Sequence, residues 1–470
     1  MGFLVARRVQ FPCEWESSNK KPTNLETEDY SRWKYIMVAM WYLMCFWFFV
    51  VFPFVVVNWV SVPNELTVVW SATIQQQGMI GAGFAHEAID FLVPLSKHVY
   101  VGWVNERALN PFKAEDSAFH DLKASDQVVL RNIYNQGLEI RRYDNQILML
   151  QFQPSYYERF LSDYYNFKKY KYKIGRCMFE TTSVPQGWVQ MINDHLDEIW
   201  VPSKFQKAVF LKEGVKKPIV VIKEGFDPDI FDRKSVPRNK EKFFKHCSRD
   251  FVFIASSKWE DRKGWDVLLE AFAEEFTGIE RVCLAIRSTG LQDELDSVHN
   301  PNHARIIKLG RIPAEDYPSY YASADAFVLP THGEGWGRTP MEAMAMGLPT
   351  IASKWSGLTE FISADYAIPI NVTEVEPAFP REQEKLGGGK SMRNSHKWAR
   401  IDKYAVRGAM RWVFNNQHAA RALGDKAERY MHTHYTRDVI AEDMHKRLLQ
   451  IYHMVFRSRD ISESQNHDLL

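Results

Sequence analysis

Short β-branched runs alternate with helical segments twice along this chain, and this alternation limits the fold more than any other feature. In the first block, runs at 66–72 and 98–104 flank a helical segment at 85–93. A second block begins at 251–257 and continues into a helical segment at 264–276. Strands that alternate with helices form parallel sheets, because each helix returns the chain to the edge of the sheet where it started. We therefore predict an α/β fold of two tandem, doubly wound Rossmann-like domains with a cleft between them.

A long apolar segment precedes the first block. Residues 35–57 carry no charged side chain. As a helix at about 1.5 Å per residue the segment would span about 35 Å, which exceeds a hydrocarbon core of about 30 Å. A cleavable signal peptide would have an apolar region of only about 7–15 residues, and a buried core helix would tolerate a polar face. The segment is therefore predicted to be a transmembrane signal anchor.

Flanking charge predicts the orientation of this anchor. Basic residues precede the segment, and the first one after it is Lys97. The positive-inside rule then keeps the tail, 1–34, in the cytosol and sends the remainder across the membrane. We expect a single-pass type II protein of the Golgi or endoplasmic reticulum membrane, with its folded domains in the lumen. The sequon at 371–373 permits glycosylation there.

The pattern after the anchor predicts the domain boundaries. An N-terminal Rossmann-like domain is expected at 66–235 and a C-terminal one at 249–430, joined by the polar, proline-containing stretch 226–250. Residues 374–398 are predicted to be a long insertion loop. A C-terminal helix at 435–456 is expected to pack back on the N-terminal domain, because its apolar residues recur at helical spacing.

Charge and motif spacing exclude several classes of protein. The formal net charge of +1 gives no overall field that would attract nucleic acid. The five cysteines are scattered, and their spacing indicates neither a disulfide framework nor a zinc site. The GGGKS run is no phosphate loop, because Glu384 stands where that motif requires glycine. Gly78, Gly81 and Gly83 follow the first strand in an order that differs from the dinucleotide-binding motif, so no nicotinamide site is expected.

Two glutamates stand eight positions apart in "THGEGWGRTPMEAMAMGLPT" (331–350). Glu334 precedes a glycine-containing turn, where backbone N–H groups can approach a ligand closely. A helix that begins after this turn favours an anion at its N-terminus, typically a phosphate. One acid before an anion site and another, Glu342, just beyond it can hold a molecule with hydroxyls at both ends and phosphates in the middle. A nucleotide sugar has this chemistry.

Glu342 also has a purely structural interpretation. Thr339 is a good N-cap, Pro340 fits the first helical position, and Glu342 lies three residues after Thr339. This is the spacing of a capping box. Gly347 then ends the helix. The sequence leaves both interpretations of Glu342 open.

The stretch "EGWGRTPMEAMAMGLPTIAS" resembles the E-x7-E signature of glycosyltransferase family four, whose members are retaining enzymes of the GT-B fold. Three further stretches are similar to that family and follow in its order, at 178–205, 221–231 and 253–272. The resemblance covers residues 66–455 and implies two Rossmann-like domains that bind a nucleotide-sugar donor between them.

The resemblance implies a role for each matching residue. Glu334 would contact hydroxyls of the donor sugar, and Glu342 those of the ribose. Lys263 matches the family's lysine and Lys258 stands where the family has arginine, so both would face the diphosphate as catalytic cations. A lysine at 258 gives up bidentate geometry, and both lysines could instead be solvated surface charges. The remaining donor-binding candidates are in the turn, the helix start and the N-terminal glycine loop: Gly335, Trp336, Gly337, Arg338, Thr339, Gly78 and Gly81.

A charge count predicts that the enzyme needs no metal and no other cofactor. A nucleoside diphosphate leaves with about −3, while two lysines and a helix N-terminus of about +0.5 supply about +2.5. Asp227-Pro228-Asp229 is similar to the metal-binding DxD of another glycosyltransferase class, but it lies in the linker and is expected to form a turn. No covalent catalyst is expected, because the family's chemistry is described as front-face with assistance from the leaving phosphate.

The sequence predicts less about the acceptor site than about the donor site. The family often carries a catalytic histidine where this chain has Gln151 and Gln153. The lysine-rich stretch 167–176 would suit an acidic acceptor or, more simply, would be a strand with one solvated face. The expected function is retaining transfer from a UDP- or GDP-sugar to a glycan, protein or lipid. The alternatives are a catalytically inactive sugar-binding or scaffold protein of the secretory pathway and a sugar phosphorylase, for which no pyridoxal phosphate lysine is evident.

Overall fold

The computed structural model describes residues 66–72, 81–105, 119, 122–139, 146–160, 170–288, 302–378 and 395–457. The chain divides into two units, Met1–Pro63 and Asn64–Leu470, and every described residue belongs to the second. Within these ranges no helix has the length and apolar character that crossing a membrane requires. The predicted cytosolic tail, the predicted anchor at 35–57 and Gly78 lie outside the described residues.

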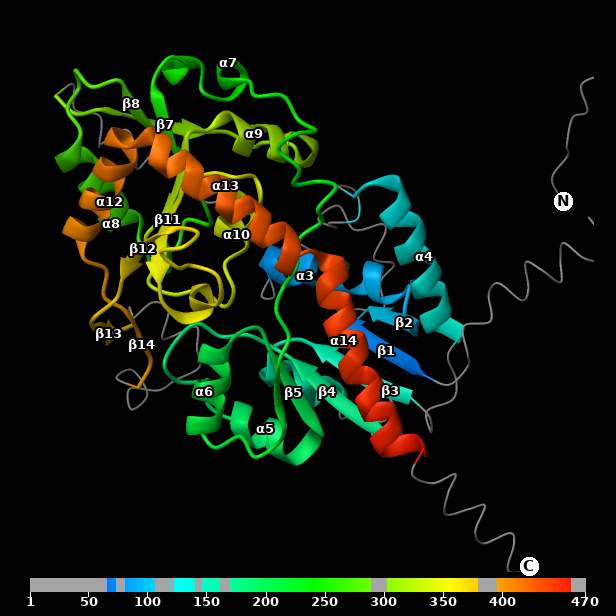
Figure 1. The fold of residues 1–470 in the computed structure, drawn as a ribbon. Coiled ribbons are helices and arrows are strands. Elements are labelled where there is room, and N and C mark those ends of the chain that lie inside the picture. Colours follow the sequence, from blue (N-terminus) through cyan, green and yellow to red (C-terminus); the bar gives the residue numbers. More distant parts are fainter. Residues whose placement is uncertain are drawn as a thin grey trace, which may run out of the picture. The chain divides into compact units, whose positions relative to one another are not determined.

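Among the described residues, six parallel strands form a first sheet with the order β2-β1-β3-β4-β5-β6 (Figure 1). The strands are β1 (Thr67–Ala72), β2 (Tyr100–Asn105), β3 (Gln146–Gln151), β4 (Tyr172–Arg176), β5 (Glu198–Val201) and β6 (Ile219–Val221). Strand β3 is buried at every residue, as expected of a parallel sheet that is covered on both faces. The helices of this half are α3 (Gly81–Leu95), α4 (Ala124–Glu139), η3 (Pro154–Phe160), α5 (Trp188–His195) and α6 (Lys204–Lys212).

A second parallel sheet, again with six strands in the described ranges, has the order β12-β11-β10-β7-β8-β9. Its strands are β7 (Phe251–Ser256), β8 (Val282–Arg287), β9 (Arg305–Leu309), β10 (Ala326–Leu329), β11 (Thr350–Lys354) and β12 (Ile368–Asn371). A separate antiparallel pair, β13 (Val375–Pro377) and β14 (Lys397–Ala399), occupies the two ends of the stretch 374–398, so the prediction of a loop is wrong at those ends. The predicted α/β architecture of two parallel sheets is therefore confirmed.

The helices of the C-terminal half alternate with strands as far as β12, and three helices in succession follow β14. The longer ones are α8 (Trp265–Glu275), α9 (Tyr317–Ser323), α10 (Arg338–Ala345), α12 (Lys403–Asn415), α13 (Gln417–His434) and α14 (Arg437–Tyr452). Short helical turns are α7 (Lys240–Phe243), η6 (Lys245–Cys247), η7 (Asp261–Lys263), η9 (Ala314–Asp316), η10 (Ser356–Glu360) and η11 (His453–Arg457). Helix α8 packs with α12 on one side of the second sheet, where Leu268 and Met410 share a core with Phe253.

Helix α14 packs against the first sheet rather than the second. Ile440, Met444 and Leu448 share a hydrophobic core with Trp70 of β1 and with α3. Two ion pairs hold its ends. Arg437 binds Asp126 of α4 at 2.6 Å, and Arg447 binds the buried Glu198 of β5. Helix α14, near the end of the described residues, therefore packs on the N-terminal half (Figure 1).

Two backbone segments, one around Phe226 and one around Thr436, lie side by side where the chain connects its two halves. The N–H of Phe226 donates to the carbonyl of Tyr435 at 3.1 Å, and the N–H of Arg437 donates to the carbonyl of Phe226 at 2.9 Å. A Cβ at Gly225 would lie 2.7 Å from the Cα of Arg437, so the close approach requires glycine. The linker and the start of α14 are thus held together by main-chain hydrogen bonds.

A fully buried ion pair lies inside the first sheet. Arg176, at the end of β4, binds Glu87 of α3 through Nε at 2.9 Å, and neither side chain is exposed. Gln151 donates to Glu87 at 2.6 Å and accepts from the indole of Trp70 at 2.8 Å. The prediction that 167–176 forms a strand with one solvated face is therefore wrong for β4, because four of its five residues are buried. Helices cover both faces of this central strand.

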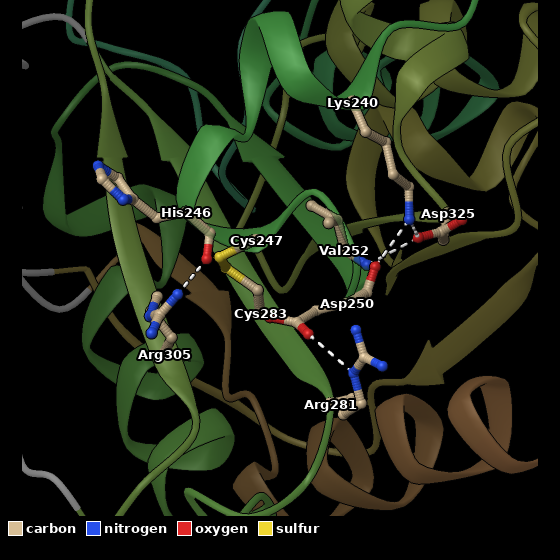
Figure 2. Close-up of a disulfide and its surroundings, with 9 residues drawn as sticks. All are labelled: Lys240, His246, Cys247, Asp250, Val252, Arg281, Cys283, Arg305 and Asp325. Carbon is tan, nitrogen blue, oxygen red and sulfur yellow. Dashed lines mark hydrogen bonds and ion pairs between the residues drawn. A yellow bond between two sulfur atoms is a disulfide. The ribbon is translucent and has the colours of Figure 1, made fainter.

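The prediction that the cysteines form no disulfide framework is also wrong. Cys247, which ends η6, forms a disulfide with Cys283 of β8, 36 positions away (Figure 2). Spacing gave no signal, because the two cysteines meet only once β7 pairs with β8 and places Val252 opposite Cys283. Both cysteines are buried. Close by, the N–H of Val252 donates to Asp325 at 2.8 Å, so the start of β7 is held by a side chain as well as by the disulfide.

Removing this disulfide should destabilise the C-terminal half. Replacing Cys247 and Cys283 by alanine opens a cross-link of 36 residues, and the lost constraint on the unfolded chain corresponds to about 3–4 kcal/mol of unfolding free energy. Guanidinium unfolding measures the change. A reductant should destabilise the wild type by a similar amount and leave the variant unaffected. Equal stability of the oxidised wild type and the variant would contradict the prediction.

Candidate functional site

The loops after β7 and β10 meet where the strand order of the second sheet reverses. Strands β8 and β9 continue to one side of β7, while β11 and β12 continue to the other side of β10. In doubly wound sheets a ligand binds beyond the carboxyl ends of the strands at such a point. Lys263 follows β7 and Glu334 follows β10, so the parallel pairing of these strands brings together two residues that the sequence predicted to act together.

Glu334 and Lys263 form a buried ion pair. The Nζ of Lys263 lies 2.7 Å from Oε1 and 2.9 Å from Oε2 of the carboxylate. A second cation, Arg262, donates through Nη1 to Oε2 of Glu334 at 3.2 Å. Glu334 is 7% exposed and Lys263 8%. The site therefore holds an ionised pair that is almost entirely removed from water.

The two cations determine the charge state of Glu334. Burial by itself would raise the pKa of this carboxyl, but Lys263 and Arg262 together hold it below its usual value. Burial and the neighbouring Arg262 lower the pKa of Lys263, and Glu334 partly offsets them. Glu334 is consequently an anion at neutral pH.

Arg262 lies at the centre of a wider network. Its Nε binds Glu180 at 3.1 Å, and its Nη2 binds Glu260 at 3.2 Å. Its Nη1 also donates to the carbonyl of Gly333. Burial, with only partial compensation from Arg262, raises the pKa of Glu180. Glu180 follows β4 of the first sheet, so this network joins the N-terminal half to the loop that carries Glu334.

The backbone at Glu334 is held from its other side by Ser356. The N–H of Glu334 donates to the hydroxyl of Ser356 at 2.9 Å, and that hydroxyl donates to the Glu334 carbonyl at 2.9 Å. Ser356 has φ 51°, which is unusual for a residue other than glycine. Such backbone strain is concentrated at functional sites. Glu334 is therefore fixed through both its side chain and its main chain.

The glycines that follow Glu334 allow close packing. A Cβ at Gly335 would lie 2.7 Å from Sδ of Met178, and one at Gly337 would lie 2.3 Å from Cδ2 of Leu358. Gly337 also has φ 108°. The carbonyl of Gly335 accepts from Gln206 of α6 at 2.6 Å. Side chains at these two glycines would therefore displace the turn.

Trp336 has a different environment from its neighbours in the turn. Its side chain is 1% exposed and belongs to the core of the C-terminal half. Its ring packs on Phe361 and Tyr435, and its Nε1 lies 3.2 Å from Sδ of Met341. The indole thus anchors the turn in the core, and only the backbone of Trp336 is available to a ligand.

Glu342 does not form the capping box that its spacing allowed. Helix α10 begins at Arg338 with Gly337 as its N-cap, and no side chain caps it. The carboxylate of Glu342 instead accepts from the hydroxyl of Tyr321 at 3.0 Å and lies 3.8 Å from Nε of Arg338. Burial raises the pKa of this carboxyl, although Arg338 and Tyr321 partly offset the effect. The structural interpretation is therefore wrong, because glycine at the N-cap moves the start of the helix by two residues.

Arg338, at the start of α10, reaches the N-terminal half. Its Nη2 donates to Asp90 of α3 at 2.7 Å, and its Nη1 lies 3.5 Å from Glu224, which follows β6. Burial raises the pKa of both Asp90 and Glu224. One turn before Asp90, burial and the nearby Arg338 lower the pKa of His86 to about 4, so this imidazole is neutral at pH 7.

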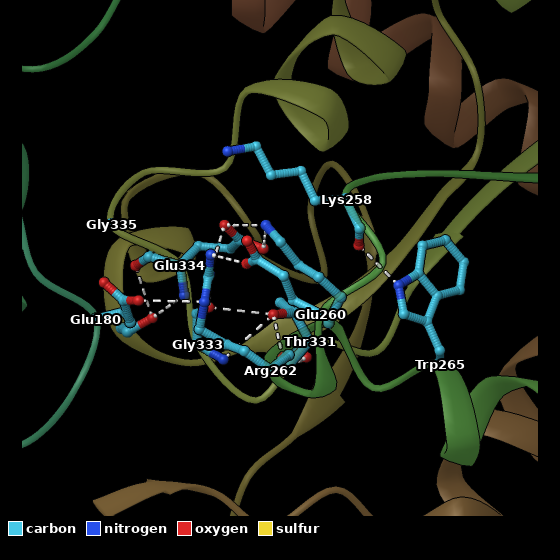
Figure 3. A network of polar contacts seen from close by, with 12 residues as sticks. Glu180, Lys258, Glu260, Arg262, Trp265, Thr331, Gly333, Glu334 and Gly335 are labelled. Atoms are coloured by element: carbon cyan, nitrogen blue, oxygen red, sulfur yellow. Dashed lines mark hydrogen bonds and ion pairs between the residues drawn. The ribbon is translucent and has the colours of Figure 1, made fainter. Parts of the chain in front are cut away.

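The remaining predicted site residues lie elsewhere. Lys258 is exposed, and in Figure 3 no dashed line joins its ammonium group to Glu334. The carbonyl of Lys258 accepts from the indole of Trp265 at 2.8 Å. Thr339 is the second residue of α10, and Gly81 is the first residue of α3. The structure thus brings Glu334 and Lys263 together and Glu342 with Arg338, but it does not bring Lys258 to them.

In the described ranges, no group of three or more His, Cys, Asp or Glu residues is placed to hold a metal ion. The DxD-like pair in the linker binds cations of the chain. Asp227 lies 2.9 Å from Lys123 and 3.0 Å from Arg437, and Asp229 lies 2.7 Å from Lys123. These contacts connect the linker to α4 and α14.

Sequence reasoning missed four residues of this site. Arg262 carried a signal, because it directly precedes Lys263 in the basic turn. Glu180 lies within 178–205, a stretch that resembles the family but in which no single residue was given a role. Asp90 and Ser356 carried no signal, since each reaches the site from a distant part of the chain.

Comparisons with known proteins find similarity to glycosyltransferases. A family described as "Glycosyl transferases group 1" matches residues 248–376, and one described as "Family 4 Glycosyltransferase in conflict systems" matches residues 313–444. The chain is 28% identical over 220 residues to mannosylfructose-phosphate synthase of Agrobacterium fabrum, covering 43% of this chain and 48% of that protein.

Two further proteins are similar. GDP-mannose-dependent alpha-(1-6)-phosphatidylinositol monomannoside mannosyltransferase of Mycolicibacterium smegmatis is 27% identical over 189 residues, which cover 37% of this chain and 48% of that protein. The chain thus spans about half the length of both curated relatives. HepE of Anabaena, solved in complex with UDP and glucose, superposes with a TM-score of 0.55 at 14% identity, covering 82% of this chain and 100% of that one. At this identity the likeness concerns the fold.

Alanine at Gly264 should disturb the turn that carries Lys263. Gly264 has φ 69°, and a Cβ there would lie 2.1 Å from the carbonyl oxygen of Pro330. The backbone conformation alone costs about 1–2 kcal/mol for alanine. Gly408 of α12 is the matched control, because its Cβ would meet nothing within 4 Å and alanine should stabilise the helix by about 0.5–1 kcal/mol. Thermal unfolding that shifts equally for both variants would contradict this prediction.

Proposed function

We propose that this chain, whose residues 248–444 match two glycosyltransferase families, is a retaining glycosyltransferase that uses a UDP- or GDP-sugar. Its fold is GT-B-like, with two parallel sheets. One observation carries the proposal, the buried pair of Glu334 and Lys263 at the point where the second sheet reverses its strand order. An anion and a cation fixed beyond the strand ends provide polar contacts for a sugar and for a phosphate at the place where such sheets bind ligands.

The proposed donor lies along the start of α10. Glu334 would accept hydrogen bonds from hydroxyls of the transferred sugar, and Glu342 would accept them from the ribose. Lys263 and the backbone of the turn at 335–337, which precedes the helix N-terminus, would meet the diphosphate between them. Lys258 is exposed and is the less supported of the two proposed cations. The family match over residues 248–444 supports these assignments.

The proposed reaction needs no nucleophile from the protein. The bond between the anomeric carbon and the leaving phosphate oxygen breaks, and a bond from that carbon to the acceptor hydroxyl forms on the same face. The acceptor proton passes to an oxygen of the departing diphosphate, so atoms and charge balance. The site contributes by stabilising charge where it develops: Lys263 faces the leaving anion, and Glu334 orients the sugar. The acceptor is a glycan, a protein or a lipid.

Gln151 does not supply the acceptor base that a histidine would supply at this position. It is 1% exposed and its amide is engaged by Trp70 and Glu87. Gln153 lies directly after β3. If a phosphate oxygen of the donor accepts the proton of the acceptor hydroxyl, the protein does not need to supply a base there. The engagement of Gln151 therefore supports the proposed front-face chemistry.

The proposed location is the lumen of the secretory pathway, with anchorage by the segment 35–57 in the Golgi or endoplasmic reticulum membrane. The disulfide between Cys247 and Cys283 supports this location, because disulfides persist in oxidising compartments and are rare in the cytosol. Asn371, the sequon residue, ends β12 and is exposed, so it is accessible to glycosylation. An uncharged anchor preceded by Lys and Arg residues and followed by none until Lys97 would deliver the folded halves to that side.

Replacing Glu334 by alanine should lower kcat by about 10²–10³, because a polar contact fixed before the reaction is lost from the transition state. The measurement is release of UDP or GDP from a panel of nucleotide sugars by the purified full-length protein. Glu374→Ala is the matched control, since this exposed glutamate pairs with Arg400 on the surface. Near-normal kcat for Glu334→Ala would reject the role assigned to Glu334.

Activity should persist after treatment with EDTA. The proposed cations balance most of the charge on the leaving diphosphate, and Asp227 and Asp229 are engaged by Lys123. The same donor assay, run before and after chelation, measures the effect. Complete loss of turnover in EDTA that manganese restores would show that the enzyme depends on a metal.

A further inference from the structure

Lys263 has two tasks if the proposed function is correct. In the structure it lies within 2.9 Å of both carboxylate oxygens of Glu334, and the proposed function also requires it to face the diphosphate of the donor. One ammonium group has three N–H donors on a flexible stem, so it can turn from one anion to the other. If Lys263 were the sole partner of Glu334, that movement would leave a buried carboxylate unpaired, which is strongly unfavourable.

Arg262 provides a second counter-ion for Glu334. Its Nη1 lies 3.2 Å from Oε2 of Glu334 and also donates to the carbonyl of Gly333. The guanidinium therefore binds the turn through a side-chain and a main-chain oxygen at once. Lys258, the other basic residue expected here, is exposed, and no dashed line joins it to Glu334 in Figure 3.

Arg262 is fixed in place, unlike a lysine on a flexible stem. Glu180 binds its Nε at 3.1 Å and Glu260 binds its Nη2 at 3.2 Å. The carbonyl of Arg262 accepts from the N–H of His332 at 2.8 Å and from the hydroxyl of Thr331 at 3.0 Å. Its side chain is 14% exposed. These contacts come from the segment after β4, from the turn after β7 and from the loop after β10, and they leave Arg262 no freedom to follow a phosphate.

We propose that Arg262 is a positioning residue that keeps Glu334 ionised and oriented while Lys263 turns to the donor diphosphate. Glu180, from the N-terminal half, completes this arrangement by holding the guanidinium from the far side. The inference rests on the proposed function, and it adds two residues to which neither the E-x7-E signature nor the basic turn assigned a role.

The electrostatics agree with this geometry. Burial alone would lower the pKa of Arg262, but Glu180, Glu334 and Glu260 raise it above its usual range, so the guanidinium stays charged. Lys263 and Arg262 are the cations that face Glu334. The facing anions are Glu180 and Glu260, and each also contacts Arg262. Removing Arg262 therefore removes a cation and releases two carboxylates near Glu334.

Loss of Arg262 should move the pH dependence of activity in one direction. Cations lower the pKa of Glu334 in the wild type, and the working form is the carboxylate, so activity is lost as the pH falls through that pKa. Without Arg262, and with Lys263 occupied by the diphosphate, the pKa of Glu334 rises. Loss of a neighbouring opposite charge moves a carboxyl by about 1–3 pH units. The acid limb of the kcat profile should consequently move to higher pH.

The experiment compares the full-length wild type with Arg262→Met. In the variant, the acid limb of the kcat profile should move to higher pH by about one unit or more. The loss of kcat relative to the wild type should therefore be about tenfold larger at the acid end of the profile than at the alkaline end. Calorimetric titration with UDP and with GDP, in buffers of different ionisation enthalpy, counts the protons taken up on binding. The variant should take up more protons than the wild type, because Glu334 becomes protonated when Lys263 leaves it.

Three further variants keep the test decisive. Arg281→Met, in which an exposed arginine paired with Asp250 is removed, is the matched control and should change neither readout. Glu180→Gln removes an anion whose repulsion raises the pKa of Glu334, so it should not move the acid limb upward as Arg262→Met does. If Arg262→Met does not fold, Arg262→Lys keeps the charge and loses the fork geometry, and it should give a smaller shift.

The outcomes separate this inference from the function on which it rests. An active wild type with an unchanged pH profile and unchanged proton uptake in Arg262→Met, or in Arg262→Lys where that variant replaces it, would overturn the inference alone. A wild type that binds neither UDP nor GDP and releases neither from any donor would overturn the proposed function, and the inference with it.

Discussion

The ion pair between Glu334 and Lys263 depends on a buried anion being matched by buried cations. Removing one partner from such a pair typically costs about 3–5 kcal/mol, because the remaining charge is left without water or a counter-ion. The surrounding structure is arranged around that requirement. Arg262 adds a second cation, Ser356 holds the main chain of Glu334, and Gly335 permits the close approach of Met178.

Buried charge also connects the two halves of the molecule. Arg262 binds Glu180 from the first half, and Arg338 binds Asp90 of α3. Arg437 joins the start of α14 to Asp126 of α4. Each contact places an arginine from the C-terminal half against a carboxylate from the N-terminal half. Arginine suits this role because its guanidinium stays charged and can bind more than one acceptor. The site therefore depends on residues from both sheets.

Local pattern was sufficient to predict much of the fold and part of the site. Strands such as β3 and β7 are continuous apolar runs, and a parallel sheet covered by helices requires such runs. The glycine turn after Glu334 was recognisable, because glycine at positive φ is required at Gly337. The helix start was predicted wrongly, since Thr339 and Pro340 fit cap positions well but Gly337 already occupies the N-cap.

By itself, the sequence determined the alternation of strands and helices and the presence of two acids around an anion-binding turn. These features are encoded within a few neighbouring residues. Only the tertiary structure decided which charges meet: Lys263 and Glu334 are 71 positions apart, and Arg338 and Asp90 are 248 apart. It likewise decided that Cys247 bonds to Cys283, and that Arg262 rather than Lys258 reaches Glu334. The physical reason is that strand pairing and helix packing bring residues together that are far apart in the sequence. The number of residues between them therefore does not predict the contact.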